Sequence, residues 1–419
     1  MQFSSLKSND FDYIADSFEE KTEMLQKKFF SSLSQADISD ISKLFILLTM
    51  SFNSVLSQDE MRQMIQRVKV NKASDAFEIS NKVLQASLTK LTLILINLFN
   101  VCVTHKYHLK QFKKTQTIVL CKSKKNDYIN SKMYWFIALL NTMSKTLKSI
   151  MIKRLSDITE THYMLSNAQI RARRKQFMIS ALNLLVNQVH AVWDCKIKYV
   201  IFMLSLNIAE AFNHVLHTKL LHTLRMRRTS NYIVEWTRSF LKNRESSLTF
   251  NEQTSAMQWI NADISQKFLI SLILFLFFNA SLIEKCKALE IKIKVLNFVN
   301  DINILIYDKI TELICKSLSW AYNVCAKWAW TYDATFASEK YELTHFIRKL
   351  KRFNMTVSLC IENLIIKLKL NIRVLEVQLN TKLQWDSHLH QIEADHVIKM
   401  LRLSWLEIFI WETTFAKAR

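Results

Sequence analysis

The sequence contains no glycine and no proline among its 419 residues. Ordinary usage of about 7% and about 5% would supply roughly 29 and roughly 21 of them, so chance does not explain their absence. Glycine is the residue that enters positive φ without a steric penalty, and this chain must build its turns with residues that carry a Cβ atom. Each such residue costs roughly 1–2 kcal/mol, and we therefore expect a chain of marginal stability.

Two origins explain this composition. Either the sequence was deliberately built without these two residues, or nucleotide changes removed them. Guanine-to-adenine changes convert Gly codons into Ser, Asp, Asn, Glu, Arg or Lys codons, and cytosine-to-thymine changes convert Pro codons into Ser, Leu or Phe codons. The same changes turn Asp into Asn and some Arg into Trp. The second origin therefore predicts particular replacements at any functional motif.

Cysteine pairs with metal-binding spacing are also missing. The 7 cysteines are odd in number and scattered, and none forms a Cys-x-x-Cys pair with another. This pattern indicates reduced thiols inside a cell and argues against a zinc site. The N-terminus shows no charged, apolar and small-residue signal pattern. We expect an intracellular protein, in the nucleus or the cytoplasm, and not a secreted one.

The residues that are present favour a globular, basic protein. A chain of this length with 50% hydrophobic residues can bury a large core and form two or three subdomains. The 57 Lys and Arg residues outnumber the 36 Asp and Glu residues, giving a formal net charge of +21. Such an excess suits a polyanion, nucleic acid before membrane lipid, although a solvated basic surface has the same composition.

Alternating apolar and polar residues predict a β-hairpin over Ile291–Asp308, with Val299-Asn300-Asp301 at its tip. Phe298-Val299-Asn300-Asp301 resembles the Phe/Tyr-x-Asp-Asp signature of reverse transcriptases, with one acid changed to Asn. A plain hairpin turn is the commoner meaning of Asn-Asp between strands. The other motifs of the family must therefore appear in order for the resemblance to hold.

The next segment in the family's scheme is an apolar strand over Tyr199–Ile208. The residues after it resemble the family pattern Asp-x-x-x-Ala-Phe-Asp-x-Val, which ends a central strand of the palm. The catalytic Asp of the pattern falls on Asn207 and its second Asp on Asn213. Phe212 falls on the aromatic gate that excludes a ribose 2′-hydroxyl, and we prefer this role to the alternative of an ordinary core aromatic.

Basic segments between Lys113 and Arg174 resemble the fingers of the family. Lys132 to Thr142 corresponds to Tyr-Arg-Pro-Ile-(Ala/Ser)-Leu, whose Arg contacts the incoming triphosphate; that Arg is Trp135 here, and Lys132 could still hold phosphate. Nucleic-acid contact is expected from six cations, namely Lys113, Lys114, Lys122, Arg171, Arg173 and Arg174.

Gln266 lies in Ile264-Ser265-Gln266-Lys267, which resembles the family's Ile-Pro-Gln-Gly, and the resemblance implies that it touches the nucleotide. The apolar run Phe268–Ile283 that follows is shorter than the roughly 20 residues that span a bilayer. We expect a buried palm helix there, with a membrane span as the alternative. With the loop at 171–175, the turn at 265–267 is where lost glycines are expected to cause most strain.

Two further motifs follow the hairpin. Phe336–Phe346 resembles the motif whose Lys lies near the pyrophosphate leaving group, and Lys340 takes that position. Arg373–Trp385 resembles the primer-grip strand Leu-Gly-Val-x-Leu-Asp, and the resemblance assigns the grip to Leu375, Glu376 and Val377. Glu376 stands where the family has Gly.

The resemblance covers nearly the whole chain and is strongest to LINE-type (non-LTR retrotransposon) reverse transcriptases, fungal ones in particular. It implies an α+β fold of the right-hand polymerase type, with a truncated thumb and a helical N-terminal extension. The implied domains are the extension at 1–104, fingers at 105–198, palm at 199–385, including the hairpin at 291–308, and the start of the thumb at 386–419.

The implied activity is template-directed, two-metal nucleotidyl transfer, with an RNA template, a DNA primer and deoxynucleotides, and with no other small-molecule cofactor. Two Mg²⁺ ions need anionic oxygen ligands. The family has three carboxylates here, but this chain has Asn207, Asn300 and Asp301, and Asp301 is the one remaining anionic metal ligand. We therefore expect an inactive polymerase descendant. The alternatives are a basic nucleic-acid-binding remnant and, less in keeping with the motifs, a membrane protein.

Overall fold

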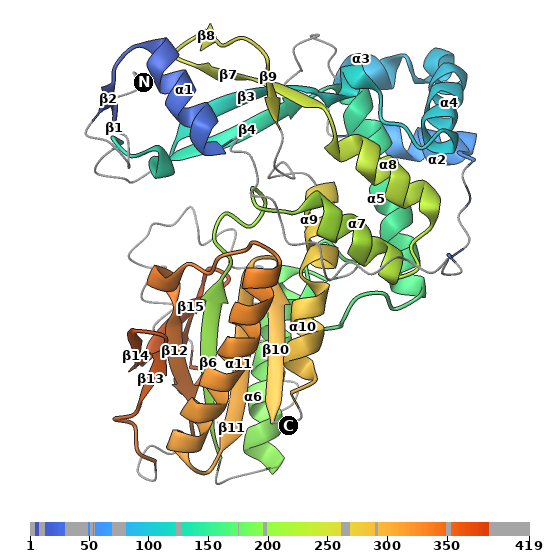
Figure 1. The fold of residues 1–419 in the computed structure, drawn as a ribbon. Coiled ribbons are helices and arrows are strands. Elements are labelled where there is room, and N and C mark those ends of the chain that lie inside the picture. Colours follow the sequence, from blue (N-terminus) through green and yellow to red (C-terminus); the bar gives the residue numbers. More distant parts are fainter. Residues whose placement is uncertain are drawn as a thin grey trace. The chain divides into compact units, whose positions relative to one another are not determined.

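The computed structural model describes most of the chain between residues 5 and 384. The described ranges are 5–7, 13–29, 49–50, 53, 55–68, 81–122, 128–174, 176–195, 199–260, 269–289, 292–348 and 353–384. The predicted thumb at 386–419, Gln266 and the turn at 265–267 lie outside them, as does the side chain of Lys132. Mixed helices and sheets confirm the α+β class (Figure 1).

The chain divides into two compact units, each built from three separate segments. Unit 1 comprises Met1–Leu165, Glu210–Asn279 and Thr331–Ala334, and unit 2 comprises Ser166–Ala209, Ala280–Trp330 and Thr335–Arg419. The units therefore interleave along the sequence, whereas the domains expected from the family follow one another. The expected domain boundaries remain a prediction.

Unit 1 contains a sheet with strand order β4-β3-β7-β8, and β9 also pairs with β7. These strands are β3 (Lys114–Cys121), β4 (Tyr134–Leu140), β7 (Arg244–Phe250), β8 (Gln253–Thr254) and β9 (Gln258–Ile260). β3 is antiparallel to β4 and parallel to β7. Part of its sequence alternates buried and half-buried residues, as expected for a strand with one covered face.

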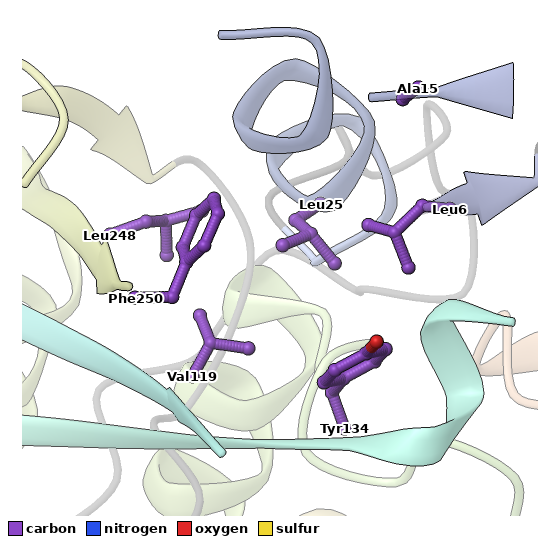
Figure 2. Close-up of a cluster of buried hydrophobic side chains, with 7 residues drawn as sticks. All are labelled: Leu6, Ala15, Leu25, Val119, Tyr134, Leu248 and Phe250. Carbon is purple, nitrogen blue, oxygen red and sulfur yellow. The ribbon is translucent and has the colours of Figure 1, made fainter. Parts of the chain in front are cut away.

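One face of this sheet packs against the N-terminal elements β1 (Leu6–Lys7), β2 (Ile14–Ala15) and α1 (Phe18–Phe29). Figure 2 shows the cluster, in which Leu25 of α1 lies among side chains of the strands. Its buried members are Leu6, Ala15, Leu25, Val119, Tyr134, Leu248 and Phe250. The N-terminal segment therefore contributes a short antiparallel strand pair in addition to the helices that the sequence predicts.

The remaining elements of unit 1 are helical. They are α2 (Gln58–Gln66), α3 (Asn81–Ala86), α4 (Leu88–Thr104), η1 (Lys110–Lys113), η2 (Ser131–Met133), α5 (Thr142–Thr161), α7 (His217–Met226), α8 (Asn231–Leu241) and α9 (Leu269–Phe278). The side chain of Ser57 caps α2 by accepting from the Glu60 backbone N–H at 3.1 Å, the usual role of Ser before a helix. α4 lies within residues 1–104, where the sequence predicts helices.

The described part of the predicted apolar run begins at Leu269 and forms α9 and the first half of α10 (Ala280–Lys287). Residues 270–278 of α9 are buried apart from Leu272, and α9 packs against α5 and α7. Among the helices that the structure describes, none is long and apolar enough to span a bilayer. The prediction of a buried helix is confirmed, with a break at Asn279 that divides it in two.

Unit 2 contains a seven-stranded sheet with order β13-β14-β12-β6-β11-β10-β5. Its strands are β5 (Gln169–Ile170), β6 (Val200–Asn207), β10 (Ile293–Phe298), β11 (Asp301–Asp308), β12 (Glu342–Phe346), β13 (Ser358–Ile361) and β14 (Leu364–Lys369). Its helices are α6 (Met178–Cys195), α10 and α11 (Thr311–Thr331), with the short η3 (Ser338–Lys340). β6 lies in the interior of the sheet, and its continuous apolar sequence matches a strand covered on both faces.

The predicted hairpin is confirmed from Ile293 to Asp308 as β10 and β11, paired antiparallel with Phe298 opposite Asp301, and Ile291 lies outside the described residues. The connection is therefore Val299-Asn300 alone, and Asp301 is the first residue of β11. The predicted primer-grip strand is instead a second hairpin, formed by β15 (Asn371–Val374) and β16 (Val377–Asn380). The chain reverses there because Leu375 and Glu376 both adopt positive φ, at 50° and 70°.

Turns with positive φ are built without glycine, as the composition predicts. Fifteen of the described residues have positive φ and carry a Cβ atom, namely Lys106, Tyr163, Arg171, Ala172, Glu210, Arg228, Asn243, Asn251, Glu252, Val299, Asp333, Glu362, Leu375, Glu376 and Leu383. Asn and Asp tolerate this region best, yet they provide three of the fifteen. The strained loop predicted from residue 171 is confirmed at Arg171 and Ala172.

Buried neutral histidines make the fold sensitive to acid. Burial lowers the pKa of His345 in β12, and of His217 in α7, to about 4. Both ring nitrogens of His345 are buried without a hydrogen-bond partner. An unfolded histidine has a pKa near 6.5, so the unfolded state binds protons first as the pH falls. The stability is therefore present above about pH 6.5 and is lost progressively toward pH 4.

We expect the melting temperature to fall between pH 7 and pH 5, and to fall less in His345→Phe, which cannot be protonated. Thermal unfolding of both proteins at the two pH values measures this. Equal decreases in the two proteins would show that His345 does not contribute.

Candidate functional site

The candidate site of unit 2 is organised by the pairing of β6 with β11. Asn207 is the last residue of β6 and Asp301 the first of β11, and the register places them directly opposite each other. The Nδ2 group of Asn207 donates a hydrogen bond to Oδ1 of Asp301 at 2.5 Å. Two of the three predicted metal positions therefore meet at one end of the sheet, and their side chains form a hydrogen bond with each other.

The third position, Asn300, lies in the hairpin connection. Its backbone carbonyl accepts from the Ile208 N–H at 2.9 Å, which ties the turn to the residue after β6. The turn depends on Val299, which is buried and has φ of 62°. The fully buried Asn297 supports it, because its Nδ2 group donates to the carbonyl oxygens of Val299 at 2.9 Å and of Asp301 at 3.3 Å.

A backbone hydrogen bond to the end of β6 positions Lys340 near Asn207 and Asp301. The Ala337 N–H donates to the carbonyl of Asn207 at 2.9 Å, and the η3 turn begins directly after it. Burial raises the pKa of Asp301 above its ordinary value, and the Asn207 hydrogen bond and the Lys340 charge oppose that rise. Lys340 is thus the cation whose field reaches Asp301.

These residues share one cavity of about 540 Å³ with the β15–β16 hairpin. Its lining consists of Ser205, Leu206, Asn207, Asp301, Asn303, Lys340, Glu342, Arg373, Val374, Leu375 and Glu376. Arg373 and Glu376 form an ion pair across the hairpin turn. The structure therefore brings two of the predicted primer-grip residues, Leu375 and Glu376, to the predicted catalytic positions. Val377 is buried and does not line the cavity.

Several polar residues of the site have no counterpart in the sequence prediction. The Ser205 hydroxyl donates to the Asn303 amide oxygen at the cavity, and Asn303 is 2% exposed. Asn303 and Asn297 are polar residues inside otherwise apolar strands, which is the signal that could have identified them. Arg373 and Glu342 could not be identified, because charged residues on strands are ordinarily solvated.

Unit 1 contains part of the predicted nucleotide-binding and nucleic-acid-binding set, namely Phe212, Trp135, Lys113, Lys114 and Lys122. Phe212 is half-buried, and its ring packs against Phe275 with 5.2 Å between centroids. Trp135 on β4 is 49% exposed. Lys114 forms an ion pair with Glu245 at 4.0 Å, whereas Lys113 is buried, and burial lowers the pKa of its ammonium group. Lys113 is therefore a packed residue, and not the surface cation that the sequence predicts.

The remaining predicted cations differ in the same way. Lys122 is half-buried after β3, and its backbone carbonyl accepts from the Tyr128 hydroxyl at 2.6 Å. In unit 2, the guanidinium of Arg173 is buried and donates to the carbonyl of Ser166 at 2.8 Å, so it holds the loop together. Arg171 and Arg174 are exposed, and the Arg171 guanidinium lies 5.2 Å from the centroid of the Phe298 ring.

The site residues do not fit a pair of divalent cations. In the part of the chain that the structure describes, no three His, Cys, Asp or Glu side chains group closely enough to hold a metal ion. The amide of Asn207 faces Asp301 with its N–H group, which repels a cation where a carboxylate would attract one. At the three family metal positions a single carboxylate remains, and it lies within reach of the Lys340 charge. The other carboxylates of the cavity lining, Glu342 and Glu376, form ion pairs with Lys369 and Arg373. This arrangement cannot offset the mutual repulsion of two Mg²⁺ ions.

Comparison with known proteins gives two findings. Residues 122–385 match the family described as "Reverse transcriptase (RNA-dependent DNA polymerase)". The chain is also 20% identical over 357 residues to the "RNA-directed DNA polymerase from mobile element jockey" of Drosophila melanogaster. That match covers 84% of this chain and 38% of the relative, so the chain spans well under half of the relative's length.

Proposed function

Because the chain belongs to the reverse transcriptase (RNA-dependent DNA polymerase) family, we propose that it is an inactive member that still binds primed RNA. The family acts on an RNA template, a primer and nucleotides, and uses a divalent metal. The similarity to the jockey polymerase supports an origin in a non-LTR retrotransposon. In this proposal the protein acts inside the cell, where such templates are found.

The observation that carries the loss of activity is the Asn207–Asp301 hydrogen bond. In a two-metal reaction the ions neutralise charge that develops on the transferred phosphoryl group. Here the two side chains at the meeting point of β6 and β11 are an amide donor and one carboxylate. The site therefore has the position of the family's catalytic centre without its charge. We expect no primer extension from the unaltered chain at any Mg²⁺ concentration.

Binding of the primed template is proposed from the residues around that position. Lys340 is exposed at the cavity, and Leu375 and Glu376 present the turn of the β15–β16 hairpin to the same space. An RNA backbone in this cavity would meet both the ammonium of Lys340 and the hairpin turn. The net charge of +21 adds attraction that does not depend on sequence.

We expect affinity for a primed RNA duplex to fall steeply with salt. Binding releases cations that are condensed on the phosphates, and a high salt concentration opposes this release. Lys340→Ala should reduce the slope of log affinity against log salt by about 0.9, the value of one phosphate contact. Fluorescence anisotropy across a salt series measures both quantities. Lys367→Ala, an exposed lysine on β14 that does not line the cavity, is the matched control. An affinity that does not change with salt would contradict the proposal. Equal slopes in Lys340→Ala and Lys367→Ala would show that Lys340 does not contact the RNA at this site.

A further inference from the structure

Helix α11 of unit 2 presents a regular row of exposed side chains along one side. The row consists of Leu313, Lys316, Trp320, Asn323, Lys327 and Trp330, and we call it the α11 stripe. Its members recur every three or four residues, the spacing of one helix face. The opposite side of the helix is buried in unit 2 through Ile314, Leu318, Ala321, Cys325 and Trp328. At 1.5 Å per residue the stripe is about 25 Å long, and Figure 1 shows the helix lying along the strands of its sheet.

Two large indole rings in this stripe are exposed to solvent. Trp320 is 47% exposed and Trp330 is 78% exposed, and ten residues of helix separate them by about 15 Å. Exposed tryptophan is unusual on a surface, and grouped apolar exposure marks a site of interaction. The same helix also contains a tryptophan that faces the interior of unit 2, Trp328, and this one is fully buried.

The stripe alternates aromatic and cationic or amide side chains. Lys316 and Lys327 lie within one turn of Trp320 and Trp330 respectively, and Asn323 lies between the two lysines. The stripe contains no acid. The one acid of the helix, Glu312, accepts hydrogen bonds from Thr311 at 3.1 Å and Asn354 at 2.8 Å. A helix partner would need a continuous apolar seam, which the lysines interrupt.

We propose that the α11 stripe binds a single strand of nucleic acid, with bases stacked on Trp320 and Trp330 and phosphates beside Lys316 and Lys327. Exposed aromatic rings interleaved with cations are what single strands require, because every base offers a π-face and every linkage a negative charge. None of the stripe residues lines the cavity of unit 2, so this site is additional to the one proposed for primed RNA.

Substitution of the two rings tests the proposal. We expect an oligothymidylate of about 12 nucleotides to bind the unaltered chain, and Trp320→Leu with Trp330→Leu to weaken binding about tenfold or more, since each stacked base contributes about 1–3 kcal/mol. Trp320→Tyr with Trp330→Tyr keeps a stacking face and should retain most of the affinity. Lys316→Gln with Lys327→Gln should lower the salt slope by about 1.4, the value of two single-strand phosphate contacts.

Controls separate this proposal from a general loss of binding. Trp259→Leu removes an indole that is 56% exposed in unit 1 and should leave oligothymidylate affinity unchanged. The leucine variant should also bind primed RNA duplex as the unaltered chain does, whereas Lys340→Ala should affect the duplex alone. Unchanged oligothymidylate affinity in the leucine variant would overturn the stripe proposal. An equal loss in the leucine and tyrosine variants would also overturn the proposal that bases stack on the two rings.

Discussion

Replacing Asn207 and Asn300 by aspartate is expected to give Mg²⁺-dependent extension of a primed RNA template, at least about 10³-fold above the unaltered chain. Two added carboxylates restore the anionic ligand set opposite Asp301, and metal stabilisation of developing charge contributes several kcal/mol to such a reaction. Asn207 already lies directly opposite Asp301 in the strand register, so the new carboxylate needs no movement of the backbone. Incorporation of labelled deoxynucleotide into a primer measures the result.

A second measurement does not depend on catalysis. In Asn207→Asp the two carboxylates face each other at the contact that is now 2.5 Å long, and their repulsion should lower the melting temperature in the absence of metal. Mg²⁺ should then raise the melting temperature of the variant and leave that of the unaltered chain unchanged. If Mg²⁺ stabilises the variant but extension stays absent, the remaining defect lies elsewhere, and Trp135 at the family's triphosphate-binding Arg is the next position to restore. If Mg²⁺ stabilises neither protein, the ligand-charge argument is wrong.

Glycine at five strained positions should stabilise unit 2 substantially. The positions are Arg171, Ala172, Val299, Leu375 and Glu376, all with positive φ between 50° and 80°. Removal of the Cβ atom relieves roughly 1–2 kcal/mol at each, and the extra freedom of glycine in the unfolded chain returns up to about 1 kcal/mol. Loss of the buried Val299 side chain returns about 2 kcal/mol more. A net gain of about 3 kcal/mol corresponds to a melting temperature higher by roughly 6–12 °C for a unit of this size. Differential scanning calorimetry measures the shift.

Matched positions distinguish relief of strain from an unspecific effect of glycine. Asn243 and Asn251 have φ of 55° and 49°, and asparagine tolerates this region. Asn243→Gly with Asn251→Gly should therefore change the melting temperature little. Ala172→Gly should give the clearest single gain of the five, because it removes the Cβ atom and no other group. Val299→Gly relieves strain as well, but it also loses the burial of a side chain that is 5% exposed. If the variant with all five glycines has a melting temperature equal to or below that of the unaltered chain, the surrounding contacts already compensate the strain.

The elements that local pattern determines were predictable from the sequence. The alternation over Ile291–Asp308 gave the β10–β11 hairpin, and the apolar strand from Tyr199 gave β6. The order of the motifs placed Asn207, Asp301 and Lys340 at one site, and the cavity lining contains all three. These predictions held because each depends on a period of two residues or on the spacing of a known motif, and neither requires knowledge of distant contacts.

Other features depend on contacts that the sequence does not display. Lys113 and Arg173 look like surface cations in the sequence, but the fold buries them beside an aromatic ring and backbone carbonyls respectively. The β15–β16 hairpin looks like one strand, because Leu375 and Glu376 give no turn signal in a chain without glycine. Ser205 and Asn303 become a hydrogen-bonded pair only when β6 and β11 adopt their register.

The interleaved order of the two units also bears on how the protein can be made. β6 pairs with β11 and β12, which the ribosome produces about 100 and about 140 residues later. At about 5–20 residues per second, the newly made β6 waits roughly 7–30 s for its second neighbour. During that delay a largely apolar strand has both edges open, a state that chaperones bind and that other nascent chains can join. The yield of this protein should therefore depend more on the rate of synthesis and on chaperone supply than that of a protein whose strands pair in sequence order.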